Sequence, residues 1–321
     1  MTETTPAFQV CIAGTGSYVP EKILTNAELA ERVDTSDEWI LSRTGIRERR
    51  IAAEGEFTSH MATHAARKAL EQAGLAVEDI DLIIVATITP DTPTPATACY
   101  VQQYLGAVNA VAFDISAACS GFLYAMKISK PMIASGAFKN ALIIGAEKLS
   151  AVTNWQDRST CVLFGDGAGA AVLRRAAPEE GSILATEMGS DGNLTHLLNI
   201  PGGGSACPIT ASNVVDHLYT LNMMGKEVFK HAVTRMMQPE EIACVIPHQA
   251  NLRIIDAIAD RLAVPNDRFF VNLDKYGNTS AAAVAIALDE AHRTGAFKRG
   301  DHIVLVVFGA GLTWAAAAVR W

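Results

Sequence analysis

A strand gives way to a helix in the stretch DISAACSGF, residues 114–122, and a single cysteine, Cys119, lies at the change. Residues 110–115 have the pattern of an apolar β-strand, and residues 122–134 have helical spacing of apolar side chains. The thiol is therefore expected beside the first free N–H groups of a helix, where a thiolate is stabilised. The alternative is a buried small hydrophobic residue, the commoner role of a free cysteine.

Two distant segments repeat this pattern and favour the functional interpretation. In VIPHQAN, residues 245–251, and in YGNTSA, residues 276–281, a polar side chain follows a β-type run and precedes a helical run. Three strand ends would then present the thiol of Cys119, the imidazole of His248 and the carboxamide of Asn278. Cysteine, histidine and asparagine on separate elements are typical of a nucleophilic site, because such partners meet in space and not in sequence.

The residue types narrow the chemistry. A cysteine protease also uses these three types, but no protease-type sequence surrounds Cys119. In the other role, His248 and Asn278 both donate hydrogen bonds to one thioester oxygen and stabilise an enolate. When the enolate arises by loss of CO2 from a malonyl group, no base is needed to remove a proton, so an uncharged asparagine suffices.

The chain resembles the β-ketoacyl-acyl carrier protein synthase III family along essentially its whole length. That resemblance implies a thiolase-like five-layer αβαβα fold of class α/β with two similar halves, and a homodimer. The segments that carry it are DTSDEWI (34–40), RTGIRER (43–49), the Cys119 stretch, FGDGAGAA (164–171), HQANLRI (248–254), GNTSAA (277–282) and TW (313–314).

Composition agrees with a large core between helices. Half of the 321 residues are hydrophobic, and the apolar runs are nearly continuous, which favours mostly parallel sheets covered on both faces. A polar turn at 176–181 divides the chain into 1–176, a half carrying the nucleophile, and 177–321, a half carrying the histidine and asparagine. The loop 189–216 is long enough to be a cover or an interface element.

The pattern of apolar residues also predicts individual elements. Helices are expected at 58–73, 97–105, 120–135, 222–237, 250–263 and 279–293. Strands are expected at 9–16, 80–88, 110–116, 140–146, 161–173, 181–188, 242–246, 268–273, 302–308 and 313–320.

Charge and cysteine content bound the function. The net charge of −8 argues against nucleic-acid binding. No signal-like segment and no apolar run of about 18 residues is present, so no membrane association and a cytoplasmic location are expected. The six cysteines show no spacing for zinc or for a disulfide framework, and Cys11, Cys161 and Cys244 are expected in the core. No metal and no redox cofactor are expected.

The resemblance assigns residues to two acyl-thioester partners. Trp39 and Arg158 match a pair that sandwiches the adenine of coenzyme A, with Arg43 and Gly225 as further contacts; stacking on an indole and a guanidinium is physically sound. Arg253 and Lys230 match contacts to the acyl carrier protein. From the sequence alone, a solvated charged face is an equally good interpretation of these basic residues, and the acidic Asp260 limits the basic patch.

The backbone N–H groups of Cys119 and Ala310 match the family's oxyanion hole. Ala310 stands where the family commonly has glycine, so we infer that its φ is negative. Phe308 occupies the position at which thiolases that deprotonate acetyl groups place a second cysteine. The resemblance therefore favours a decarboxylating reaction over a proton-abstracting one.

The end of the acyl tunnel is expected at Thr94, contributed by the partner subunit, together with Phe164, Leu221 and Met223. Short-chain members of the family can have a phenylalanine at the position of Thr94. Each methylene buried in the space left by the missing ring would contribute about 0.8 kcal/mol. The sequence therefore predicts tolerance of medium to long acyl-CoA primers, unless the methionines refill the space.

These inferences predict a decarboxylating Claisen condensation of an acyl-CoA with malonyl-acyl carrier protein, which starts fatty acid synthesis. An alternative is the same chemistry in a secondary pathway, priming a polyketide or joining two long acyl groups. A third hypothesis is a non-catalytic partner subunit with a thiolase fold. It is disfavoured because Cys119, His248 and Asn278 are all present.

Overall fold

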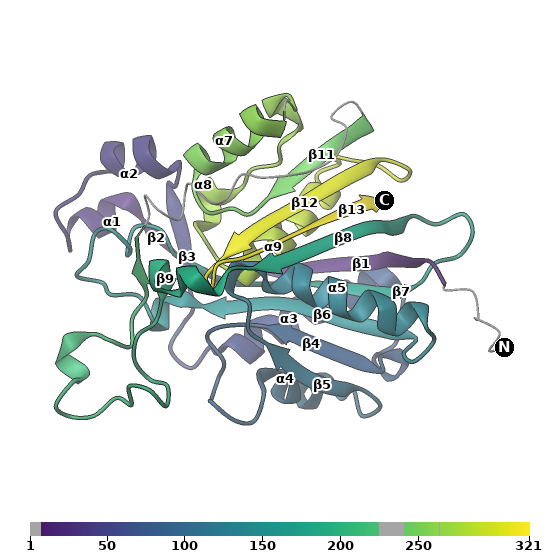
Figure 1. The fold of residues 1–321 in the computed structure, drawn as a ribbon, viewed down its shortest axis with the longest axis horizontal. Helices are drawn as coiled ribbons and strands as arrows, with labels where there is room; N and C mark the ends of the chain where they lie inside the picture. Colours follow the sequence, from purple (N-terminus) through teal and green to yellow (C-terminus); the bar gives the residue numbers. More distant parts are fainter. Residues whose placement is uncertain (1–7, 225–240, 263) are drawn as a thin grey trace.

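The structure, a computed structural model, describes residues 8–224, 241–262 and 264–321. Two sheets form its core (Figure 1). The first has the strand order β1 (Val10–Tyr18), β7 (Asp166–Arg175), β6 (Asn140–Lys148), β4 (Leu82–Ala86) and β5 (Val111–Ile115). The second has the order β11 (Ile242–Pro247), β12 (His302–Gly309), β13 (Thr313–Arg320) and β8 (Ser182–Ser190).

Helices complete five layers. The central helices α5 (Gly121–Ala134) and α9 (Ala281–Arg293) lie between the two sheets and contact both of them (Figure 1). On the outer side of the first sheet, α3 (Thr58–Ala73) packs on β1 and β7, and α4 (Thr97–Leu105) packs on β5. On the outer side of the second sheet lies α7 (Leu252–Leu262), whose buried residues join the cluster of Val245 and Val304. The predicted αβαβα arrangement is confirmed.

The strand directions correct the prediction of mostly parallel sheets. In the described residues the pairs β4·β5, β4·β6 and β11·β12 are parallel, whereas β1·β7, β6·β7, β12·β13 and β13·β8 are antiparallel. A continuous apolar strand indicates that both of its faces are buried. Central helices bury the strands of this fold whether they run parallel or antiparallel, so the pattern does not determine strand direction.

Two predicted strands are wrong in part or in whole. Residues 161–163 form a turn and Phe164 makes only an isolated bridge, so the strand expected at 161–173 begins only at Asp166. Residues 268–273 hold a single bridge, Val245↔Phe269, followed by the short helix α8 (Leu273–Tyr276). The helix expected at 222–237 begins instead with β10 (Asn222–Met223), and its remaining positions from 225 onward lie outside the described residues.

The structure also contains short elements that were not predicted. Four of these elements are 3-10 turns, at Val77–Asp79, Leu149–Ala151, Val214–Asp216 and Asn266–Arg268. The other elements are β2 (Lys22–Thr25), α1 (Asn26–Ala30), α2 (Asp37–Thr44), β3 (Glu48–Ile51), the 3-10 turn Gly192–Leu197 and β9 (Leu198–Asn199), which pairs with β10.

The central helices approach the first sheet through glycine. A Cβ atom at Gly145 in β6 would lie 2.2 Å from the carbonyl oxygen of Ala281, and one at Gly121 would lie 2.7 Å from the Cβ of Ala86. No side chain fits at these distances, so glycine sets how closely the first turns of α9 and α5 lie against the sheet. Cys119 and Asn278 lie just before the first turns of α5 and α9.

The chain passes from the first sheet to the second between Arg175 and Ser182. The division into residues 1–176 and 177–321 as two halves stays a prediction, as does a role for the loop 189–216. Within the described residues, no helix combines the length and the apolar character needed to cross a bilayer.

Candidate active site

Three connections between strands and helices bring the predicted residues to one place. Cys119 lies in the 3-10 turn Ala118–Ser120 between β5 and α5, His248 follows β11, and Asn278 precedes α9. All three side chains are buried. The segment Phe308–Gly309 joins them, because Phe308 contacts the ring of His248 and the Cβ position of Gly309 is 2.7 Å from the Cys119 nitrogen.

The nucleophile sits in a constrained turn. Ala118 has a φ of 45°, an uncommon value for a residue with a side chain, and the turn directs Cys119 into the interior. The amides of Ser120 and Gly121 are already used, since they donate to the carbonyl oxygens of Ala117 and Ala118. Of the three amides at this turn, that of Cys119 has no such backbone acceptor in the part of the chain that the structure describes.

The electrostatics of the thiol differ from the expectation of a stabilised thiolate. Burial raises the pKa of Cys119 to about 12, the Ser280 hydroxyl lowers it, the nearby Glu147 carboxylate raises it, and the residue's own backbone N–H lowers it. Desolvation is the largest of these effects, and the amides of Ser120 and Gly121 are bonded within the turn instead of to the sulfur. The thiol is protonated at neutral pH in the structure.

His248 is a neutral imidazole. Burial lowers its pKa to about 3, and its Nδ1 has no hydrogen-bond partner among the described residues. The ring of Phe308 meets it edge-on, with centroids 5.5 Å apart. Phe308, the position that the resemblance matches to the second cysteine of proton-abstracting thiolases, thus brings an apolar ring against the imidazole. A neutral imidazole has one N–H group to donate.

Asn278 has a fixed orientation. Its Oδ1 accepts a hydrogen bond of 2.9 Å from the Ser280 N–H, and its own backbone N–H donates to Leu163 at 2.8 Å. Since Oδ1 is occupied, the NH2 group is the part of the amide left to bind a ligand. The contact of Asn278 with Phe164 as a parallel bridge holds the loop in place.

The oxyanion-hole prediction has a geometric basis. Gly309 approaches the Cys119 nitrogen, so the adjoining Ala310 lies beside the nucleophile. As predicted, Ala310 is not among the described residues with positive φ, so its Cβ causes no backbone strain. The Thr313 hydroxyl ties the two segments together through contacts of 3.1 Å with Ala117 O and Ala310 O.

Four residues that support the site were not singled out from the sequence. Arg49 is fully buried, donates to Leu24, Asn26 and Val162, and packs against the Gly277 turn. Thr313, Ser280 and Glu147 surround the Cys119 turn. Only Glu147 could have been identified from its local sequence, because it is an acidic residue at the end of an apolar run.

The structure brings the predicted coenzyme A residues together. The guanidinium of Arg43 lies 4.8 Å from the centroid of the Trp39 ring, and that of Arg158 lies 5.4 Å from it. Arg158 is held by Asp34 through its backbone oxygen at 2.7 Å and its carboxylate at 3.1 Å. An indole flanked by two cations is suited to bind a flat, phosphate-bearing ligand. Gly225 lies outside the described residues.

The predicted acyl-pocket residues fall into two places. Phe164, Leu221 and Met223 belong to one apolar cluster, and Met223 also packs in a second cluster with Phe308 and Leu312. This second cluster reaches the ring that contacts His248. Thr94 is exposed and belongs to neither cluster.

Of the predicted docking residues, Arg253 is exposed on α7. It lies near the Trp39 site, because Asn251 donates to Arg43 O at 3.1 Å and also accepts from the Arg253 N–H at 2.9 Å. Asp260 is exposed on the same helix. Lys230 lies outside the described residues.

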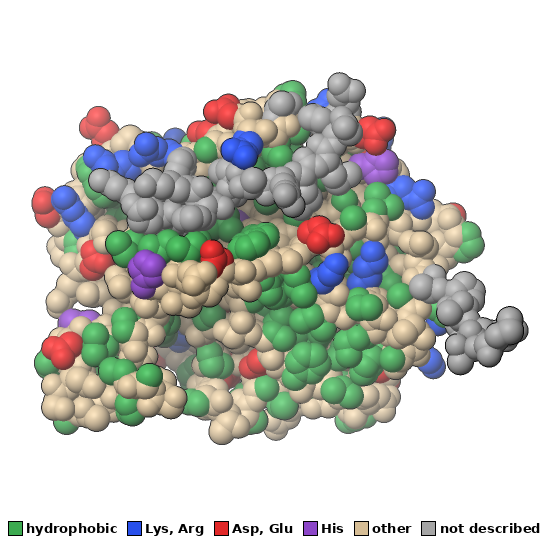
Figure 2. Space-filling view, viewed as in Figure 1, with side chains coloured by type: hydrophobic (Ala, Val, Ile, Leu, Met, Phe, Trp, Pro, Cys, Tyr) green, Lys and Arg blue, Asp and Glu red, His purple; other side chains and the backbone are tan. Residues whose placement is uncertain are grey.

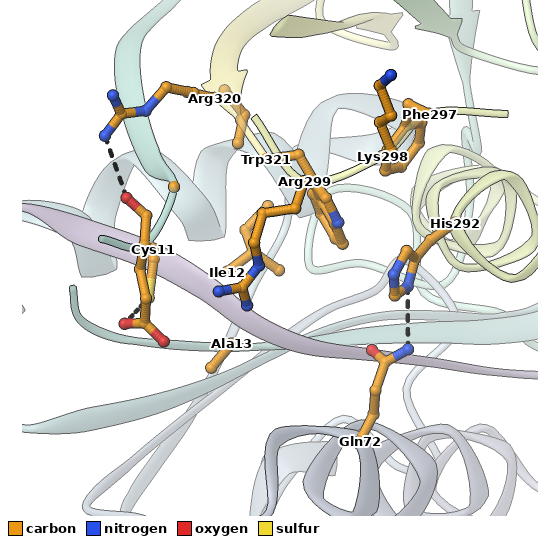
Figure 3. Close-up of a pocket in the computed structure, with 13 residues that line it drawn as sticks. Cys11, Ile12, Ala13, Gln72, His292, Phe297, Lys298, Arg299, Arg320 and Trp321 are labelled. Atoms are coloured by element: carbon orange, nitrogen blue, oxygen red, sulfur yellow. Dashed lines mark hydrogen bonds between the residues drawn. The ribbon is translucent and has the colours of Figure 1, made fainter. Parts of the chain in front are cut away.

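Other cysteines and cavities are separate from this site. Cys11, Cys161 and Cys244 are buried, as predicted. A cavity of about 330 Å³ lies at the opposite end of the sheets, bordered by Cys11, His292, Arg299 and Trp321, and none of the predicted site residues lines it (Figure 3). No group of three or more His, Cys, Asp or Glu in the described part of the chain could hold a metal ion.

Comparison with known proteins identifies the family of the chain. Sequence profiles for 3-oxoacyl-[acyl-carrier-protein] synthase III match residues 113–192 and, for its C-terminal part, residues 234–321. A β-ketoacyl-[acyl-carrier-protein] synthase III of Caldanaerobacter subterraneus is 55% identical over 97% of both chains.

Solved structures agree as well. The crystal structure of 3-oxoacyl-[acyl-carrier-protein] synthase III from Aquifex aeolicus is 50% identical, with a TM-score of 0.90 over 97% of this chain and 100% of that chain. The priming β-ketosynthase of the R1128 polyketide pathway is 36% identical, with a TM-score of 0.88 over 99% of this chain and 97% of that one. The chain has the thiolase-like fold and belongs to the β-ketoacyl-[acyl-carrier-protein] synthase III family.

Proposed function

We propose that this protein condenses an acyl-CoA with malonyl-acyl carrier protein, with loss of CO2, to give a 3-oxoacyl-acyl carrier protein that starts fatty acid synthesis. The observation that carries the proposal is the pair of neutral donors gathered in one buried site with a thiol. His248 is kept uncharged by burial, and Asn278 is turned so that only its NH2 group is free. Two such donors stabilise an enolate and remove no proton.

The first half-reaction is acyl transfer. The acyl-CoA lies with its adenine at Trp39 and its thioester at Cys119. The sulfur attacks the carbonyl carbon, the oxyanion accepts hydrogen bonds from the N–H groups of Cys119 and Ala310, and the bond to the coenzyme A sulfur breaks.

The second half-reaction is condensation. Malonyl-acyl carrier protein enters, its carboxylate leaves as CO2, and His248 and Asn278 hold the enolate oxygen. The enolate carbon then attacks the acyl group on Cys119, and the thiolate leaves. This chemistry requires no metal and no redox cofactor.

The test is to label the enzyme with radioactive acetyl-CoA and malonyl-acyl carrier protein. Wild type should form an acyl-enzyme, with the label on the peptide of Cys119, and release CO2. Cys119→Ser should lose acylation, whereas Cys161→Ala, at another buried cysteine, should keep it. Label on the Cys99 or Cys161 peptide would contradict the site assignment. A protein that dimerises but never acylates would support the third hypothesis, a non-catalytic subunit.

Two surfaces suit macromolecular partners. The exposed Arg253 beside Arg43 supports docking of the acidic carrier protein at the mouth of the coenzyme A site. A homodimer is supported by β5, which is an edge strand whose Val111 is 53% exposed. Apolar side chains also gather around α5 and β8 on the face shown in Figure 2. Edge strands of this kind pair readily with a second copy.

The acyl group is proposed to be medium to long. Thr94 is small and exposed, so in a homodimer it would leave the end of a partner's tunnel open, while Leu221 and Met223 are already packed. Wild type should therefore prefer octanoyl- or dodecanoyl-CoA to acetyl-CoA in kcat/KM, and Thr94→Phe should reverse that order. A wild type confined to acetyl-CoA would contradict this proposal.

A second candidate function uses the same chemistry in a polyketide pathway. It is favoured by the likeness to the R1128 priming β-ketosynthase, which covers nearly the whole chain. Assays with carrier proteins from fatty acid and polyketide pathways would separate the two functions. For location, free cysteines throughout the described residues suit a reducing cytoplasm.

A further inference from the structure

One buried cation close to the site has no role in the reaction described so far. Arg49 lies in β3, is fully buried and forms no ion pair among the described residues. Burial lowers the pKa of its guanidinium to about 10, so the group is still charged at neutral pH. A charge buried without a counter-ion is costly unless hydrogen bonds compensate it. The groups that the guanidinium binds therefore indicate its role.

The guanidinium of Arg49 joins three separate segments. Its Nη1 donates to Leu24 O at 3.1 Å and to Asn26 Oδ1 at 2.8 Å, and its Nη2 donates to Val162 O at 2.7 Å. The Asn26 amide is itself fixed, since its Nδ2 donates to Ile46 O at 2.8 Å. An arginine suits such simultaneous contacts, because its donors are held in one rigid plane. Val162 is thereby tied to the strands β2 and β3.

The segment that follows Val162 holds the backbone of Asn278. The Asn278 N–H donates to Leu163 O at 2.8 Å, and the Asn278 carbonyl oxygen accepts from the Gly165 N–H at 3.1 Å. These two hydrogen bonds lie on either side of Phe164, which forms the parallel bridge with Asn278. The position of the Asn278 backbone therefore depends on the position of this segment.

The stem of Arg49 packs against both partners of this contact. A Cβ atom at Gly165 would lie 3.1 Å from the Arg49 Cβ, and one at Gly277, directly before Asn278, would lie 3.4 Å from it. Neither glycine has a side chain, so the stem of Arg49 lies next to the backbone at both positions. Arg49 thus contacts the two segments with its stem and binds one of them with Nη2.

We propose that Arg49 is a positioning residue, whose guanidinium holds the Val162 segment so that the Asn278 NH2 group meets the enolate oxygen. The inference rests on the proposed condensation. Asn278 Oδ1 is already held by the Ser280 N–H, so the direction of the NH2 group is set by the backbone around it. A displacement of about 1 Å at a reacting centre can slow a reaction about 10²-fold.

The first test compares the two half-reactions in Arg49→Met and in Arg50→Met. Methionine keeps an unbranched stem and removes every donor of the guanidinium. We expect Arg49→Met to release CO2 from malonyl-acyl carrier protein about 10²-fold more slowly than wild type, and to acylate Cys119 at nearly the wild-type rate. Unchanged CO2 release would overturn the proposal, and so would equal losses in the two half-reactions, because a general defect of the fold slows both.

Arg50→Met is the matched control. Arg50 is the next residue of β3, and its Nη1 donates to Pro20 O instead of to the Val162 segment. This variant should match wild type in both half-reactions.

Arg49→Lys takes the place of Arg49→Met in the same assays if the methionine variant does not fold. Lysine keeps the charge and the stem, but its single Nζ cannot hold Asn26 and Val162 together. CO2 release should again be slowed more than acylation. A lysine variant that slows neither half-reaction would overturn the role of the guanidinium.

The second test asks whether Arg49 acts through Asn278. In the Asn278→Ala background the carboxamide is absent, so adding Arg49→Met should not slow CO2 release any further. If the losses of the two single variants multiply in the double variant, Arg49 acts independently of Asn278 and the proposal is wrong.

A third measurement does not depend on activity. Hydrogen exchange in the peptide that contains Asn278 reports the bond from its N–H to Leu163 O. Exchange should be faster in Arg49→Met than in wild type and in Arg50→Met, and unchanged exchange would contradict the proposal. If wild type releases no CO2 from malonyl-acyl carrier protein, the proposed condensation fails, and the exchange rates distinguish that failure from a failure of Arg49 to hold the segment.

Discussion

Asn278 is presented to the site as a donor. Its Oδ1 is occupied by the Ser280 N–H, so an aspartate at this position would offer only a repelling carboxylate oxygen to the enolate. We expect Asn278→Asp to slow decarboxylation of malonyl-acyl carrier protein by about 10²–10³-fold, the cost of one oxyanion donor.

Acyl transfer to Cys119 should be far less affected by this change, because its oxyanion is held by backbone amides. CO2 release and acyl labelling, measured on the same preparation, check the difference. Equal losses in both half-reactions would show that Asn278 has another role.

His248 makes the folded protein sensitive to acid. Its pKa is about 3 in the folded chain and about 6.5 in an unfolded one, so between these values the unfolded state binds more protons. Its neutral form stabilises the fold fully above pH 6.5, and that contribution is lost as the pH falls toward 3. We expect the Tm of wild type to fall more between pH 7 and pH 5 than that of His248→Gln. If the Tm of both proteins fell equally with pH, the imidazole of His248 would be hydrated in the folded protein.

At the scale of the elements, the site depends on how closely α9 approaches β6. Gly145→Ala would place a Cβ 2.2 Å from a backbone oxygen of Ala281, which cannot move aside as a side chain can. Overpacking of this kind costs about 1–3 kcal/mol or more, and it would displace Ser280 with the helix. We expect a lower Tm and loss of acylation.

Gly192→Ala is the matched control, because a Cβ at Gly192 would meet nothing within 4 Å. Thermal unfolding and acyl labelling of both variants check the prediction. A normal Tm in Gly145→Ala would mean that α9 can move away from the sheet.

The role of a residue can be predicted from the sequence when it follows from the pattern of the residue's own segment. Cys119, His248 and Asn278 each follow an apolar run, and that pattern was sufficient to place them at strand ends or loops beside helices. Ser280 and Glu147 lie beside the place where α9 packs on β6, at the close approach of Gly145 to Ala281, and no local pattern reports that contact. Strand direction was wrong for the same reason, since burial on both faces does not depend on it.

At the scale of the whole molecule, β5 is the exposed edge strand through which we propose that two copies assemble. Val111 is 53% exposed at the edge of the first sheet, and a lysine there would oppose pairing with a second copy. We expect Val111→Lys to raise the dimer dissociation constant at least about tenfold, as measured by sedimentation velocity. Ile23→Lys, at an exposed apolar residue of β2, should leave it unchanged. A Val111→Lys protein that remains fully dimeric would exclude β5 as the interface.

The glycine contacts beneath the nucleophile also bear on how such an enzyme can diversify. Gly121 and Gly145 leave no room for even a methyl group. A single substitution at either position therefore cannot add side-chain volume around the turns that hold Cys119. The segment from Ser190 to Met224 carries Leu221 and Met223 outside the two large sheets. If Leu221 and Met223 line the proposed acyl pocket, changes in this segment can alter the substrate while the residues that hold Cys119 stay the same.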